Sequence, residues 1–130
     1  MKSVWWKVVL LSVVVVFSLA GCDWLLGMLN PSIITWSDTA SGYRDQVNDT
    51  MTFTLVAGGS PGTVWGTDVY TDDSSIGTAA VHAGLITFAA GGTVTIRILP
   101  GQASYSGTTR NGVTSLDYGE WPGSFEFVTD

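Results

Sequence analysis

The part of the chain after residue 50 alternates apolar and polar side chains, and this period of two constrains the fold most strongly. In residues 51–55, the apolar side chains of Met51, Phe53 and Leu55 alternate with the polar side chains of Thr52 and Thr54. Similar short runs occur at residues 64–70, 93–99, 112–118 and 124–128. Glycine- and proline-containing turns separate the runs. Because alternation of this kind is typical of strands with one buried face, the sequence predicts a domain of mostly β structure.

One segment, residues 73–84, departs from the alternation and predicts a short helix of about three turns. Its apolar residues at helical spacing are Ile76, Ala79, Ala80 and Ala83. Asp73 or Ser74 can cap the first turn, and Gly84 suits the position that follows the helix. Further apolar residues lie outside the alanine stripe, so we expect the helix to be enclosed by the sheet. The fold class is therefore α+β, mostly β.

The first 21 residues have the pattern of an export signal. Lys2 and Lys7 precede an apolar run at residues 8–17 that is too short to span a bilayer. Leu-Ala-Gly-Cys at residues 19–22 resembles the lipobox of bacterial lipoproteins. The resemblance implies cleavage before Cys22 and acylation of its thiol, which would hold the protein on a membrane outside the cytoplasm. The alternative is an ordinary secretory signal followed by a chance cysteine.

The charge of the chain excludes one class of partner. After removal of the signal, three arginines remain against eleven acidic residues, a formal charge of −8. We therefore expect no nucleic-acid partner, since binding to phosphates depends on Lys and Arg. The mature chain divides into a lipidated N-terminus and tether at residues 22–39 and one domain at residues 40–130.

The helix and its flanks resemble the LCCL domain family. The likeness rests on Val-Trp-Gly-Thr-Asp-Val-Tyr-Thr-Asp-Asp-Ser-Ser-Ile at residues 64–76 and Ala-Ala-Val-His-Ala-Gly at residues 79–84. Later blocks follow in the family's order at residues 91–92, 100–101, 105–107 and 110–115. The resemblance implies one central short helix wrapped by two antiparallel sheets. It also implies that Tyr70, Asp73, Ser74, His82 and Gly84 are motif residues, to which we assign structural roles.

The chain departs from the family at a disulfide bond. The resemblance implies a cysteine in the helix after Ser-Ser-Ile, bonded to one before the first glycine-rich loop. Here Gly77 occupies the helix position, and residues 55–60 contain no cysteine. We expect the topology to survive and a side chain from residues 55–60 to lie against Gly77.

Few residues offer chemistry for catalysis. His82 is the only histidine, and we expect it to bridge the helix to a neighbouring segment. Asp68, Asp72 and Asp73 lack the spacing of a calcium loop. No cysteine beyond Cys22 is present to act as a nucleophile or thiolate ligand. We therefore predict that the protein is not an enzyme and uses no metal or cofactor.

A loop at residues 101–112 is the candidate binding site. It contains Tyr105, Arg110 and Asn111, which combine an aromatic ring, a positive charge and an amide on a segment expected to be exposed. The alternative is that Tyr105 is buried and Arg110 pairs with a carboxylate. Several other aromatic residues could form a sugar-stacking platform, although packing in a small core explains them better. These are Trp36, Trp65, Tyr70, Tyr118 and Trp121.

The sequence is compatible with three functions. The first is a membrane-anchored, extracytoplasmic binding module, for which the family resemblance implies a lipid, lipopolysaccharide or other glycan ligand. The second is a structural or protein-interaction component of the cell envelope. The third is a small hydrolase, which the single histidine disfavours.

Overall fold

A computed structural model of the chain describes residues 31–129. The export signal and the acylation predicted at Cys22 lie outside this part of the chain. Within the described residues, no helix is both long enough and apolar enough to cross a membrane.

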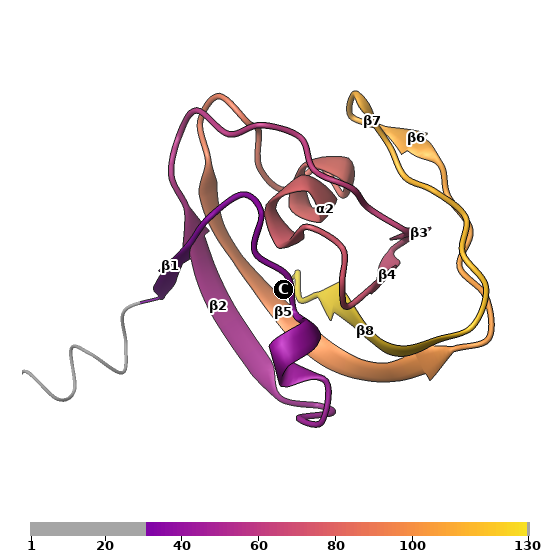
Figure 1. Cartoon of the computed structure of the whole chain (residues 1–130). Coiled ribbons are helices and arrows are strands. Elements are labelled where there is room, and N and C mark those ends of the chain that lie inside the picture. The colour runs from indigo at the N-terminus through magenta and orange to yellow at the C-terminus, as the bar shows by residue number, and fades with distance from the viewer. Residues whose placement is uncertain (1–30, 130) are drawn as a thin grey trace, which may run out of the picture. The chain divides into compact units, whose positions relative to one another are not determined.

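The domain is built on one six-stranded sheet with the strand order β1-β2-β5-β8-β4-β3 (Figure 1). The strands are β1 Ser32–Ile34, β2 Thr50–Leu55, β3 Gly66–Thr67, β4 Val69–Thr71, β5 Gly92–Gln102 and β8 Trp121–Phe127. A second, two-stranded sheet pairs β6 Thr109–Arg110 with β7 Val113–Thr114. A short 3-10 helix, η1 Ser41–Tyr43, precedes β2. The α+β, mostly β class predicted from sequence is confirmed.

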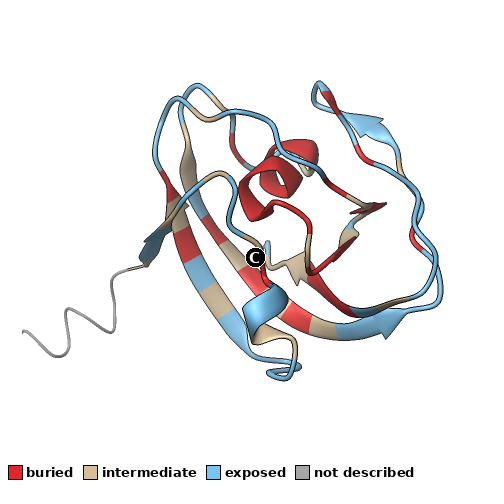
Figure 2. Ribbon diagram, viewed as in Figure 1, coloured by how far each residue is buried: buried red, intermediate tan, exposed pale blue. Residues whose placement is uncertain are grey.

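The helix α2, Ile76–His82, is enclosed as predicted. All seven of its residues are buried, and Figure 2 shows it as the most completely buried element beside the curved sheet. Two of its alanines, Ala79 and Ala80, belong to the same core as buried side chains of the sheet. The helix has about two turns rather than three, because Ser75 caps it: the Ser75 hydroxyl accepts a hydrogen bond from the backbone N–H of Thr78 at 3.1 Å. The prediction that Asp73 or Ser74 is the cap was wrong.

The sheet presents one face to the helix. Phe53 and Leu55 of β2 are buried, and Ile96 and Ile98 of β5 lie beside them in the same core. On the opposite face, threonine hydroxyls pair across β2 and β5, as in the 2.8 Å contact between the side chains of Thr52 and Thr95. The alternation in the sequence therefore separates the core from the solvent-exposed face.

The folded unit begins earlier than the sequence suggested. Ser32–Ile34 lies in the segment expected to be a tether, but it forms β1 and pairs with β2 in parallel. We expected both sheets to be antiparallel, but β1 and β2 pair in parallel, whereas the other strand pairs are antiparallel. The described fold therefore begins at Ser32 rather than at residue 40.

Gly77, which stands where the family has a half-cystine, contacts the segment before the glycine-rich loop, as predicted. A β-carbon placed on Gly77 would lie 2.5 Å from Cδ2 of Leu55, so the segment before the glycine-rich loop does pack against the helix at this point. The predicted contact between this segment and Gly77 is confirmed.

Candidate functional site

The motif histidine lies in the core, where its ring joins three elements. His82 has no exposed surface. Its Nδ1 lies 2.9 Å from the hydroxyl of Tyr70, and its Nε2 lies 3.1 Å from the carbonyl oxygen of Thr108. That carbonyl can only accept, so the geometry fits a ring that carries its hydrogen on Nε2 and accepts from Tyr70 at Nδ1. His82 thus ties β4 to the segment that enters β6.

The other motif residues also face inward. Ser74 accepts a hydrogen bond from the backbone N–H of Trp65 at 3.0 Å. Asp73 is half-buried, and its Oδ1 has no hydrogen-bond partner among residues 31–129. Gly84 follows the helix with a φ of +82°, a left-handed conformation that suits glycine.

The loop at residues 101–112 proved different from the sequence expectation. Tyr105 is only 4% exposed, so the prediction that it is available on the surface was wrong. Its hydroxyl accepts from the backbone N–H of Gln102 at 3.0 Å and donates to the carbonyl of Trp121 at 3.2 Å. Its backbone forms two hydrogen bonds with Tyr118. Tyr105 therefore supports two aromatic residues that lie nearer the surface.

The other two candidates in this loop also have partners within the fold. Arg110 is exposed, as expected, but its Nη1 lies 2.8 Å from Oδ1 of Asp68. The side-chain amide of Asn111 donates to the carbonyl of His82 at 2.9 Å and so satisfies an acceptor at the end of α2. The structure therefore confirms the alternative stated for this loop, in which Tyr105 is buried and Arg110 pairs with a carboxylate.

Three aromatic residues form a continuous row at the surface. The ring centroids of Trp65 and Tyr118 are 6.2 Å apart, and those of Tyr118 and Trp121 are 5.6 Å apart. Both pairs are edge-on, a favourable arrangement for aromatic rings. Tyr118 at the centre is 42% exposed, and Leu116, whose backbone pairs with that of Trp65, is 47% exposed. We call these four residues the aromatic row.

An arginine ends the row at Trp121. The guanidinium carbon of Arg44 lies 5.5 Å from the centroid of the Trp121 ring. A buried carboxylate, that of Asp72, holds both residues: it accepts from Arg44 at 2.8 and 2.9 Å and from Nε1 of Trp121 at 2.8 Å. Three hydrogen bonds to one buried group fix the positions of the guanidinium and the indole.

The charge state of this cluster follows from its contacts. Burial alone would raise the pKa of Asp72, but the hydrogen bonds from Arg44 and Trp121 and the charge of Arg44 outweigh it and lower the pKa below its ordinary value. The same hydrogen bond raises the pKa of Arg44. The pair therefore remains ionised, and the row ends in a guanidinium whose charge a buried carboxylate balances.

In the sequence, Trp65, Tyr118 and Trp121 are separate aromatic residues that no pattern groups, and none points to Arg44. Arg44 and Asp72 are 28 residues apart, and no local pattern links them. The one feature of the sequence that could have drawn attention to Arg44 is the small number of positive side chains, since it is one of only three in the expected mature chain.

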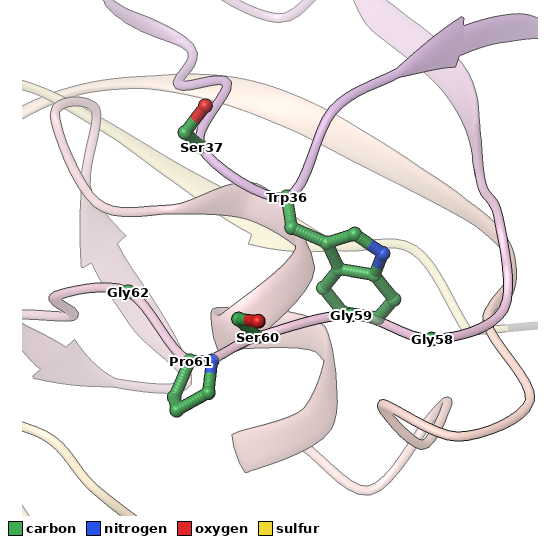
Figure 3. A pocket seen from close by; sticks show the side chains of 7 residues that line it. All are labelled: Trp36, Ser37, Gly58, Gly59, Ser60, Pro61 and Gly62. Carbon is green, nitrogen blue, oxygen red and sulfur yellow. The ribbon is translucent and has the colours of Figure 1, made fainter.

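A shallow pocket lies elsewhere, beside the first glycine-rich loop (Figure 3). Its volume is about 330 Å³, and it is lined by Trp36, Ser37 and residues 58–62, none of them charged. The indole of Trp36 packs closely against the backbone at Gly59 and Gly77, and its Nε1 donates to the carbonyl of Val56 at 2.9 Å. Trp36 is therefore fixed by packing, and the pocket offers hydroxyl and backbone groups beside its edge.

The fold and these sites define a small, mostly β domain in which the motif residues serve the interior and the aromatic row lies outside. The family model of the LCCL domain matches residues 35–125, and the chain belongs to the LCCL domain family.

Curated relatives match part of this chain. Human vitrin is 45% identical over 62 residues, which are 48% of this chain and 9% of vitrin. Guinea pig (Cavia porcellus) cochlin is 44% identical over 62 residues, 48% of this chain and 11% of cochlin. Human cysteine-rich secretory protein LCCL domain-containing 2 is 45% identical over 56 residues, 43% of this chain and 11% of that protein. The chain thus matches about a tenth of the length of these relatives.

Proposed function

We propose that the protein is a lipid-anchored, extracytoplasmic LCCL module that binds a glycan or lipid ligand without catalysis. The aromatic row carries this proposal. Partly exposed tryptophan and tyrosine rings next to a fixed guanidinium are suited to the apolar faces of sugars or to the boundary between lipid head groups and acyl chains. One relative is named as a secretory protein, which supports a location outside the cytoplasm.

The interior of the domain supports a non-catalytic role. Both ring nitrogens of His82 lie within hydrogen-bond distance of buried or backbone partners, and the ring has no exposed surface. A general base must reach the proton that it removes, and His82 cannot do so in this conformation. This arrangement disfavours a hydrolase.

The position of the row also determines what kind of ligand fits. Arg44 is already paired with Asp72, so it offers hydrogen-bond donors rather than uncompensated positive charge. Glu120 is exposed in the same segment as Tyr118 and would repel an anion. A neutral glycan surface or a zwitterionic lipid is therefore favoured over a strongly anionic one.

The test compares the full chain with Tyr118→Ala on immobilised glycans and on immobilised phosphocholine, the head group of phosphatidylcholine, in a detergent without sugar head groups. Tyr118→Ala should weaken capture about tenfold and leave the melting temperature nearly unchanged. Ile33→Ala, an exposed apolar residue on β1, is the control and should bind normally.

The outcomes separate the competing functions. If neither surface captures the unaltered chain, the glycan or lipid proposal fails, and capture by an envelope protein becomes the leading alternative. If Tyr118→Ala and Ile33→Ala bind equally well, the aromatic row is not the site.

A further inference from the structure

The two most exposed large apolar side chains of the described residues lie at one edge of the sheet, on β1 and directly after β2. Ile33 of β1 is 73% exposed, and Val56 is 61% exposed. Ile33 is paired with Thr54 of β2, two residues before Val56. The β2 residues on either side of Thr54, Phe53 and Leu55, are buried. Ile33 and Val56 therefore belong to the solvent-exposed side of this edge and not to the core.

The loops next to this edge lie against one another and carry no charge. The backbone N–H of Gly58 donates to the carbonyl of Phe88 at 2.9 Å, so the loop after β2 lies against the loop before β5. Trp36, which follows β1, joins them, since the centroid of its ring is 5.3 Å from that of Phe88. No Asp, Glu, Lys, Arg or His occurs at residues 50–67 or 83–96.

We call β1 and the loops at residues 56–59 and 87–91 the uncharged end. Along the chain, β1 is the element nearest to the expected lipid anchor. Nine residues separate Cys22 from Ser32, and an extended chain of that length reaches at most roughly 35 Å. Large apolar side chains, which favour the membrane interface, are frequent among these nine residues: Trp24, Leu25, Leu26, Met28 and Leu29. An anchor at Cys22 would therefore keep β1 close to the bilayer.

Charge also favours this end for contact with lipid. The expected charge of −8 on the mature protein repels anionic head groups from most of its surface. In the sequence, the charged residue closest to β1 is Asp38, whose Oδ2 accepts from the backbone N–H of Thr35 at 2.7 Å. A zwitterionic bilayer therefore suits this end better than an anionic one. A second copy of the chain is a poorer occupant, because it brings the same negative charge and β1 offers only three residues for strand pairing.

We propose that the uncharged end contacts the membrane that holds the lipid anchor, with the side chains of Ile33 and Val56 at the boundary between head groups and acyl chains. This orientation depends on the lipid anchoring proposed above. Transfer of the two exposed apolar side chains out of water favours the contact. The tether gives the domain a high effective concentration at the bilayer, so a small contact area is sufficient.

This orientation places the aromatic row away from the bilayer. At the start of β5, Gly92 pairs with Leu55, whereas at its end Gln102 pairs with Trp121 of the row (Figure 1). With 11 residues in β5 and about 3.3 Å per residue, the two ends are up to roughly 33 Å apart. The row then meets ligands outside this membrane, which favours a glycan over a lipid of the same bilayer.

The test uses the acylated full chain, reconstituted into phosphatidylcholine vesicles, with a polarity-sensitive nitrobenzoxadiazole probe on Ile33→Cys or on Val56→Cys. Acylation blocks Cys22, so the introduced cysteine is the only free thiol. Gln102→Cys, an exposed residue at the far end of β5, carries the control probe. Nitroxide-labelled lipids should quench the probes at residues 33 and 56 about threefold or more strongly than the control, and iodide in the water should quench them less.

A charge placed on the contact separates docking from anchoring. Ile33→Asp should return the probe at residue 56 to water, because a carboxylate resists transfer out of water, while mass spectrometry still finds the acylated N-terminus. Gln102→Asp adds the same charge at the far end of β5 and should change nothing.

Three results would overturn the proposal: equal lipid quenching at residues 33, 56 and 102, a probe at residue 56 that stays in lipid in Ile33→Asp, or quenching that depends on the protein-to-lipid ratio. The last result would assign the uncharged end to a second copy of the chain. A chain without acyl groups would overturn the anchoring itself, and the docking with it. Tyr118→Ala should leave the probes unchanged, so a failure of ligand binding at the aromatic row is separately visible.

Discussion

The indole of Trp36 packs against Gly77, so that a β-carbon on that glycine would lie 2.6 Å from Cε3 of the ring. The same indole lies against Gly59 of the glycine-rich loop. The family pattern implies a disulfide bond between the helix position of Gly77 and this preceding segment. In this chain a tryptophan packs between the two segments, so buried apolar surface joins elements that a covalent bond would otherwise link.

Gly77→Ala should destabilise the domain by up to about 2 kcal/mol. Alanine normally favours a helix over glycine by about 1 kcal/mol, but the added methyl group would overlap Trp36 and Leu55, and such overpacking costs about 1–3 kcal/mol. Gly42→Ala is the matched control, because nothing lies within 4 Å of its β-carbon position. Denaturant unfolding of both variants measures the difference. A Gly77→Ala protein more stable than the unaltered chain would contradict the packing described here.

Asp72→Asn should lower stability at neutral pH by about 2–3 kcal/mol, because it removes a buried acceptor of charge-assisted hydrogen bonds from Arg44. The folded pKa of Asp72 is below its ordinary value, so its contribution is complete above about pH 4. It is lost as the pH falls from there through the folded pKa. Thermal melts from pH 7 to pH 2 should therefore converge for the two proteins in acid. Asp49→Asn, at an exposed aspartate, serves as the control.

The strands and the enclosed helix could be predicted, because each follows from a local pattern of apolar residues: a period of two for the strands and helical spacing for the helix. The helix cap could not, because Asp73, Ser74 and Ser75 are all capping residue types and tertiary contacts choose among them. Ser75 also donates to the carbonyl of Trp36 at 2.7 Å, which fixes it at the start of the helix. The contribution of Trp36 itself was hidden, because the segment around it lacks a period.

The candidate site was harder to predict than the fold. Tyr105 lies in a glycine-containing loop, where burial depends on its pairing with Tyr118 thirteen residues later. The pair of Arg44 and Asp72 depends on a similar long-range contact. Residue type indicated which side chains could bind a ligand, but only the sheet topology shows which of them reach the surface.

Tyr105→Phe should lower the free energy of unfolding by about 1–2 kcal/mol, because the Tyr105 hydroxyl bridges Gln102 and Trp121. Burial raises the pKa of this hydroxyl, so it remains a donor through neutral pH. Arg110→Ala should change stability by less than about 0.5 kcal/mol, since its pair with Asp68 is exposed. Chemical denaturation ranks the two variants. Equal losses of stability would show that the ion pair supports the fold more than its exposure indicates.

Cys22→Ser tests the proposed membrane attachment. Acyl chains contribute about 0.8 kcal/mol for each buried CH₂ group, whereas the apolar run at residues 8–17 is too short to span the bilayer. The variant should therefore remain uncleaved or appear in the soluble fraction, while the unaltered protein stays with membranes at its mature size. Fractionation with mass spectrometry of the N-terminus measures both properties, and Ser18→Ala, a small-residue change that keeps the cysteine, controls for effects on export. A Cys22→Ser protein that stays in membranes at mature size would contradict lipid anchoring, because neither acyl chains nor a spanning helix would then account for its attachment.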